Sequence, residues 1–352
     1  MLIKSSGHLE GGLYLFTLGD SCHYALSSLL PPSASPPEAA NAQDSAHEGA
    51  HGAAPHDSIT PEPITPRPVT PRNPKHPGLS NSPFAVFDPG SSAHAEHLIT
   101  RLESQGFNLK NLQFIFPTHL HPERISGIPL LRSRAPQAIF VASQQMKRML
   151  SDKGFVAALH TEDQRMREEL SAGVLKLSPA EITEGFKVDE CLSDSDVIAI
   201  GDDTTMRANI QAGHSPCSLS YFIQPHEYLI CDETLGYYRG RELPAPAPDD
   251  DRAQYRKSLA QIAKLELRAL CLPYAGVLTG ELLPKHLQRL NSTLDDIEKQ
   301  FAQAAAGGVS HEEFRAALRS QVFNSLSRDP ILTYAMERSF EALSTQLLKS
   351  CS

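Results

Sequence analysis

The chain has 352 residues, 40% of them apolar, which is enough for one large or two ordinary domains with a sizeable core. Its formal net charge of −9 argues against nonspecific nucleic-acid binding, because a protein that neutralises phosphates needs a basic face. No apolar run approaches the roughly 20 residues that span a bilayer, and residues 1–12 lack the apolar core of a signal peptide, so we expect a soluble, cytoplasmic protein without membrane or nucleic-acid partners.

The six cysteines are scattered along the chain without a C-x-x-C pair. This spacing is typical neither of a structural zinc site nor of a disulfide-rich domain, so we expect reduced thiols. The sequence does not predict the oligomeric state.

The first predicted elements are two strands that form a hairpin, at residues 13–18 and 23–30. A proline-rich segment follows at residues 31–83 and holds 13 of the chain's 27 prolines. Such a segment cannot bury enough apolar surface to offset its ordering entropy, so we expect a disordered insertion that loops out of the fold. A third strand is predicted directly after it, at residues 84–88.

The middle of the chain first mixes strands with helices and then continues mainly as strands. Helices are predicted at residues 94–104, 144–150 and 162–170, and strands at residues 112–116, 138–142, 197–200, 206–210, 219–223, 228–231 and 267–272. This order predicts a second sheet after the first, with helices on the outer faces.

From residue 284 onward the pattern is helical, because apolar residues such as Leu287, Leu290, Leu294 and Ile297 recur at helical spacing. Gly307-Gly308 and Asp329-Pro330 interrupt it. Three helices are therefore predicted, the last at about residues 330–348.

Two histidines, His119 and His121, stand two residues apart directly after the apolar strand at residues 112–116. Side chains at this spacing share one face only if the backbone is extended, so both rings could face one metal ion. His214 and Asp232 also stand at or near the ends of predicted strands. The sequence thus predicts three imidazoles and one carboxylate at strand ends.

Four ordered motifs carry a resemblance to a known family: FAVFDPG at residues 84–90, IFPTHLH at 115–121, GHSP at 213–216 and CDETL at 231–235. In this order the chain resembles the metallo-β-lactamase-fold hydrolases, among them glyoxalase II. The resemblance implies an α+β fold, a four-layer αββα sandwich over residues 1–295, with a C-terminal helical segment at residues 296–352. It also implies that His119, His121 and His214 hold a first metal, with Asp232 at the position that bridges to a second.

The chain departs from the family's pattern at the second metal position. Glu123 and Arg124 replace the family's aspartate and histidine, and Ala275 stands where its last histidine is expected. We therefore expect one divalent metal, with zinc as the first choice and iron or manganese as alternatives. Glu123 could accept a proton, and Arg124 could stabilise a developing oxyanion or, alternatively, point away and pair with a surface acid.

Three functional classes follow from this interpretation. The first is a metal-dependent hydrolase of a small ester, thioester or lactone, in which three neutral histidines leave an open position on zinc and lower a bound water's pKa to about 7. The second is a catalytically weak or inactive relative that senses a ligand or binds a partner. The third, a diiron oxidoreductase, is disfavoured by the altered second set of ligands.

Overall fold

The structure is a computed structural model that describes residues 2–4, 6–9, 12–27, 79–200, 204–238, 244–322 and 329–349. The disordered insertion predicted at residues 31–83 lies outside the described residues as far as residue 78. Its last residues contain a 3-10 turn, η2 (Leu79–Asn81), which leads into the strand that follows. Within the described ranges, no helix is long and apolar enough to cross a bilayer.

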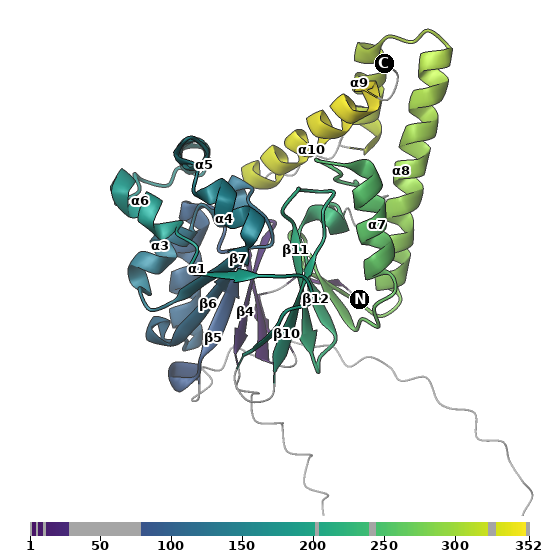
Figure 1. Cartoon of the computed structure of the whole chain (residues 1–352). Helices are drawn as coiled ribbons and strands as arrows, with labels where there is room; N and C mark the ends of the chain where they lie inside the picture. Colours follow the sequence, from purple (N-terminus) through teal and green to yellow (C-terminus); the bar gives the residue numbers. More distant parts are fainter. Residues whose placement is uncertain are drawn as a thin grey trace, which may run out of the picture.

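Two sheets form the centre of the described fold (Figure 1). The first has the strand order β2 (Gly7–His8), β3 (Leu13–Leu18), β4 (Ser21–Ser27), β5 (Phe84–Phe87), β6 (Leu112–Phe116), β7 (Ile139–Ser143) and β8 (Glu190–Leu192). The second has the order β1 (Leu2–Ile3), β14 (Val277–Thr279), β13 (Ala269–Cys271), β12 (Tyr228–Ile230), β11 (Leu219–Gln224), β10 (Thr205–Ile210) and β9 (Val197–Ala199). Strands β5 to β8 run parallel, as do β12 and β13, and the other pairs are antiparallel.

Helices cover the outer face of each sheet (Figure 1). On the side of the first sheet lie α1 (Ser92–Gln105), α2 (Pro122–Ile125), α3 (Ile128–Arg134), α4 (Gln144–Leu150), α5 (Lys153–Glu169) and α6 (Pro179–Gly185). On the side of the second sheet lie α7 (Arg252–Ile262) and α8 (Leu282–Ala306). This arrangement of layers confirms the predicted α+β, four-layer αββα sandwich.

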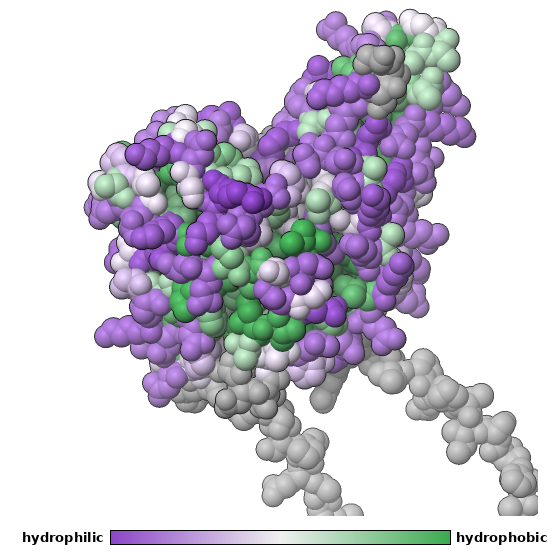
Figure 2. All heavy atoms as spheres, in the orientation of Figure 1, coloured by the Kyte–Doolittle hydropathy of each residue, from purple (hydrophilic) through white to green (hydrophobic). Residues whose placement is uncertain are grey.

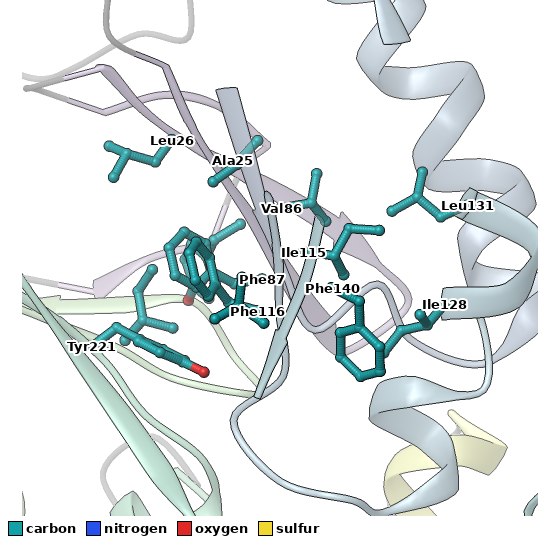
Figure 3. Close-up of a cluster of buried hydrophobic side chains, with 14 of the residues drawn as sticks. Ala25, Leu26, Val86, Phe87, Ile115, Phe116, Ile128, Leu131, Phe140 and Tyr221 are labelled. Carbon is teal, nitrogen blue, oxygen red and sulfur yellow. The ribbon is translucent and has the colours of Figure 1, made fainter. Parts of the chain in front are cut away.

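The central strands β11, β12 and β13 of the second sheet are buried on both faces, which explains their apolar runs. In β11, Tyr221 and Ile223 face the first sheet, whereas Phe222 between them packs with α7 and α8. Figure 3 shows Tyr221 meeting Phe87 and Phe116 of the first sheet, with ring centroids 5.3 and 5.4 Å apart. The inner core therefore joins the two sheets through aromatic contacts.

Three helices close the described chain: α8, then α9 (His311–Val322), then α10 (Pro330–Lys349). This agrees with the three helices predicted from the apolar spacing. Buried residues of α8 and α10 share one apolar cluster with the outer face of the second sheet. The predicted boundary between residues 295 and 296 falls inside α8, and the division of the chain at that point stays a prediction.

The molecular surface is mainly hydrophilic over the helices and more apolar over the strands in the middle of the face shown in Figure 2. Val197 and Ile210, on the edge strand β9 and at the end of β10, are 61% and 46% exposed. Helix α10 crosses above the sheets and contacts both α5 and α9 (Figure 1). Arg338 of α10 thereby reaches Glu123 of α2, at the edge where several strands end.

Candidate metal centre

The predicted histidines meet at this edge of the two sheets. His119 and His121 follow β6, and His121 keeps an extended backbone, with φ −74° and ψ 140°, because it immediately precedes α2. Pro122, the first residue of α2, is suited to that position since its ring fixes a helical φ and it has no N–H to satisfy. His214 comes from the connection between β10 and β11, on the second sheet.

Four side chains bring their ligand atoms together there: His119, His121, His214 and Glu233. These atoms all lie within 4.8 Å of one another. The Oε2 atom of Glu233 is 3.4 Å from Nε2 of His119 and 3.3 Å from Nε2 of His214, and His214 Nε2 is 3.2 Å from His121 Nδ1. In a tetrahedral zinc site with bonds of about 2.0–2.1 Å, neighbouring ligand atoms are about 3.3–3.4 Å apart. The geometry therefore fits one ion.

Two of the four ligand atoms lack a hydrogen bond. His119 Nε2 and Glu233 Oε2 are buried and have no hydrogen-bond partner among the described residues. Buried polar atoms in folded proteins are nearly always hydrogen-bonded. Two neighbouring buried atoms without a hydrogen bond therefore need an explanation. A divalent cation between them satisfies both, so the residues present fit a metal.

Hydrogen bonds around the centre orient its rings. The Thr118 hydroxyl donates to Asp88 Oδ2 at 2.7 Å and, with Asp88 ionised, is left to accept from His119 Nδ1 at 3.0 Å. His214 Nδ1 donates to the Ala247 carbonyl at 2.8 Å. With Nδ1 used in this way, Nε2 is the nitrogen of each ring that would bind a metal.

Burial and charge set the protonation of these groups. Burial lowers the pKa of His119 to about 3 and that of His121 well below its usual value, so both rings are neutral, as metal ligands must be. Burial alone would also lower the pKa of His214, but the carboxylates of Asp249 and Glu233 hold it well above the usual value. Burial raises the pKa of Asp88 to about 7. A metal ion that bound His214 would have to displace the proton that this raised pKa holds on its ring.

Arg124, on α2, points into the protein and not toward a surface acid. Its Nε and one terminal nitrogen each donate to Glu233 Oε1 at 3.2 Å, and the other terminal nitrogen donates to the Cys22 carbonyl at 3.3 Å. The guanidinium lies 4.3 Å from the ring centre of Tyr274. Oε1 of Glu233 is thus held by the Arg124 guanidinium, and Oε2 faces His119 and His214.

Glu123 lies beside the centre but is already paired. Its side chain is fully buried, and Oε1 is 4.0 Å from His121 Nδ1. Both carboxylate oxygens accept hydrogen bonds from Arg338 of α10, at 2.6 and 2.9 Å. The predicted role of Glu123 as a proton acceptor stays a prediction.

Glu233, and not the predicted Asp232, faces the histidines in this structure. Asp232 Oδ1 accepts from the backbone N–H of Thr234 at 2.9 Å, and Oδ2 accepts from the hydroxyl of Ser218. It caps the 3-10 turn η4 (Glu233–Leu235) directly after β12. Glu233 is the first residue of this turn, and from there its side chain reaches His119 and His214.

A family model supports this assignment of the fold. The model described as the metallo-beta-lactamase superfamily matches residues 80–273, which is more than half of the chain. The chain belongs to the metallo-beta-lactamase superfamily. Members of this superfamily generally bind divalent metals and act as hydrolases. No curated protein matches the chain in sequence.

Solved metallo-beta-lactamase structures resemble the chain at low sequence identity. A family protein from Thermus thermophilus is 14% identical, with a TM-score of 0.52, over 76% of this chain and 86% of that chain. A superfamily protein from Sulfolobus tokodaii is 17% identical, with a TM-score of 0.47, over 76% and 89%. The subclass B3 enzyme BJP-1 of Bradyrhizobium japonicum is 14% identical, with a TM-score of 0.48, over 85% and 94%. Of the three, the Thermus protein supports the metallo-beta-lactamase fold.

The sequence predicted the three histidines that meet here and did not indicate two charged residues that lie beside them. Glu233 is adjacent to Asp232, so a comparison of the two acids at the end of β12 could have suggested it. Arg338 gave no local signal, because it is one of several charged residues on a C-terminal helix and its partner Glu123 is 215 residues away.

Proposed function

We propose that the protein is a hydrolase of a small ester, thioester or lactone that uses one divalent metal, with zinc as the first choice and iron or manganese as alternatives. His119, His121, His214 and Glu233 would hold the ion. The observation that carries the proposal is the meeting of four donor atoms, two of them buried without a hydrogen bond. Such an ion, when bound, supplies Lewis acidity that polarises a carbonyl oxygen and lowers the pKa of water.

The surrounding side chains have separate tasks in this proposal. Arg124 holds Glu233 toward the histidines and keeps a second positive charge beside the reacting carbonyl. Glu123 is placed to accept a proton from attacking water, since it lies 4.0 Å from His121. His119, His214 and Glu233 are fully buried, whereas the side chains of His121 and Arg338 are 20% and 24% exposed. We therefore expect a small-molecule substrate to approach past these two.

The charges around the centre favour one metal over two. In the part of the chain that is described, no second group of three or more His, Cys, Asp or Glu side chains could hold an ion. Two of the carboxylates beside the histidines, Glu233 and Glu123, are each bound by an arginine. We extend the proposal to a glyoxalase II-like enzyme with a degenerate second metal position. A location in the cytoplasm is in keeping with the free cysteines among the described residues.

A second candidate function follows from the number of protein ligands. Three histidines and Glu233 make a closed set of four, which is the number usual in structural zinc sites, whereas catalytic sites keep a position open. On this interpretation the protein is a catalytically weak or inactive relative that senses a ligand or binds a partner.

Metal analysis joined to an activity panel separates these candidates. Protein purified without a metal-binding tag should carry close to one equivalent of zinc and hydrolyse at least one of a thioester, an ester and a lactone. His214→Ala should lose both the metal and the activity, whereas the matched control His97→Ala, on the exposed side of α1, should keep both. One equivalent of metal without turnover would favour the second candidate, and two tightly held equivalents would contradict the one-metal site.

A further inference from the structure

The C-terminal helix α10 places one side chain directly beside the metal centre. Arg338 donates two parallel hydrogen bonds to Glu123, at 2.6 and 2.9 Å. Its Nε lies 3.6 Å from Asp249 Oδ2, and its guanidinium is 5.6 Å from the ring centre of Tyr334. Arginine holds a carboxylate in a fixed orientation in this bidentate geometry, which a lysine cannot reproduce.

Neighbouring contacts fix the position of α10 without using Glu123. Ser339, the next residue, bonds to the hydroxyl of Tyr237 at 2.9 Å and donates to Asp249 at 3.0 Å. At the start of the helix, Asp329 Oδ2 accepts from the backbone N–H of Asp20 at 2.7 Å. The position of Arg338 is therefore set by the docking of α10 as well as by its ion pair with Glu123.

Without Arg338, the carboxylate of Glu123 could coordinate a metal ion in the centre. Its carboxylate is fully buried, and a buried, ionised carboxylate without a partner is strongly unfavourable. One of its oxygens is only 4.0 Å from Nδ1 of His121, which is one of the four donor atoms. A metal ion in the centre would be a replacement cation within reach of this acid, so Arg338 and the metal compete for it.

We infer that Arg338 is a positioning residue that keeps Glu123 out of the metal's ligand set. The C-terminal helix is thereby part of the metal centre. The inference rests on the metal site of the proposed function. Glu123 held by Arg338 stays outside the set of four donors, whereas Glu123 on the metal would add a fifth protein ligand.

Binding of Co²⁺ to the full-length, metal-free chain tests this inference, because the visible absorption of Co²⁺ weakens as its number of ligands rises. Arg338→Met should lower the absorption per bound ion relative to the wild type. The double variant Glu123→Gln/Arg338→Met should return it to the wild-type value, since an amide is a poor ligand. The matched control Arg319→Met removes another arginine that pairs with α10, at the exposed Glu337, and should leave the spectrum unchanged.

A conservative variant keeps the test decisive if Arg338→Met fails to fold. Arg338→Lys retains the charge but loses the bidentate geometry, so the spectrum should move part of the way toward that of a higher ligand number. Unchanged spectra in every folded Arg338 variant would overturn the inference, as would a change that persists in the Glu123→Gln double variant. Failure of the hydrolase proposal is distinguishable, because the spectrum reports ligands and not turnover.

Discussion

Arg124→Met should destabilise the metal-free protein strongly. The guanidinium and its partner Glu233 are both buried, with side-chain exposures of 1% and 0%. Breaking a buried ion pair by removing one partner costs about 3–5 kcal/mol, because the other charge is left unpaired. At roughly 2–4 °C per kcal/mol for a domain of 150–250 residues, the melting temperature should fall by roughly 10 °C.

Thermal unfolding in a chelator and in zinc is the assay. In zinc the loss should shrink, because the ion neutralises the carboxylate that Arg124 has left behind. Arg124→Met/Glu233→Gln should recover much of the stability in chelator, since it removes both charges. The matched control Arg319→Met breaks a more exposed pair with Glu337 and should cost about 1 kcal/mol or less after solvent screening. A loss in Arg124→Met no greater than in this control would refute the reasoning.

Three further predictions concern the ligands, their supports and the core. His119→Ala should remove most of the single equivalent of metal measured by elemental analysis, and full retention would contradict its role as a ligand. Thr118→Val removes the acceptor for His119 Nδ1 and should weaken metal affinity by about 10–100-fold in a competition titration, while Thr100→Val, exposed on α1, should not. Phe140→Ala should lower the free energy of unfolding in urea by about 3–5 kcal/mol, because this ring is fully buried in the core of Figure 3, and a loss below about 1 kcal/mol would contradict that packing.

The strands and helices with the clearest periodicity were predictable from the sequence. The strand at residues 112–116 and the helix at residues 144–150 have the predicted bounds, because their apolar patterns are strong and local. The short strands β1, β2, β8 and β14 were not predicted, and β1 and β2 have two residues each, which is too few to establish a period. Helix α5 begins about nine residues before the predicted helix at 162–170, at its N-cap Asp152.

The metal centre was predictable only as far as local spacing determines it. His119 and His121 share a face because they are two residues apart in extended backbone, and that follows from the sequence. Whether Asp232 or Glu233 faces them depends on the direction of the backbone as it leaves β12, which adjacent residues do not encode. The pairing of Glu123 with Arg338 depends on the docking of α10 against the sheets, which is a property of the whole fold.

The distance in sequence between Glu123 and Arg338 has a consequence for the order in which the centre is made. All four donor residues lie at or before residue 233, so they are synthesised roughly a hundred residues ahead of Arg338. At translation rates of about 5–20 residues per second, that delay is roughly 5–20 s. A metal ion that bound the growing chain in this interval would meet Glu123 before Arg338 has been synthesised. Arg338 on α10 would then have to displace Glu123 from the metal. Loading after release from the ribosome avoids this competition.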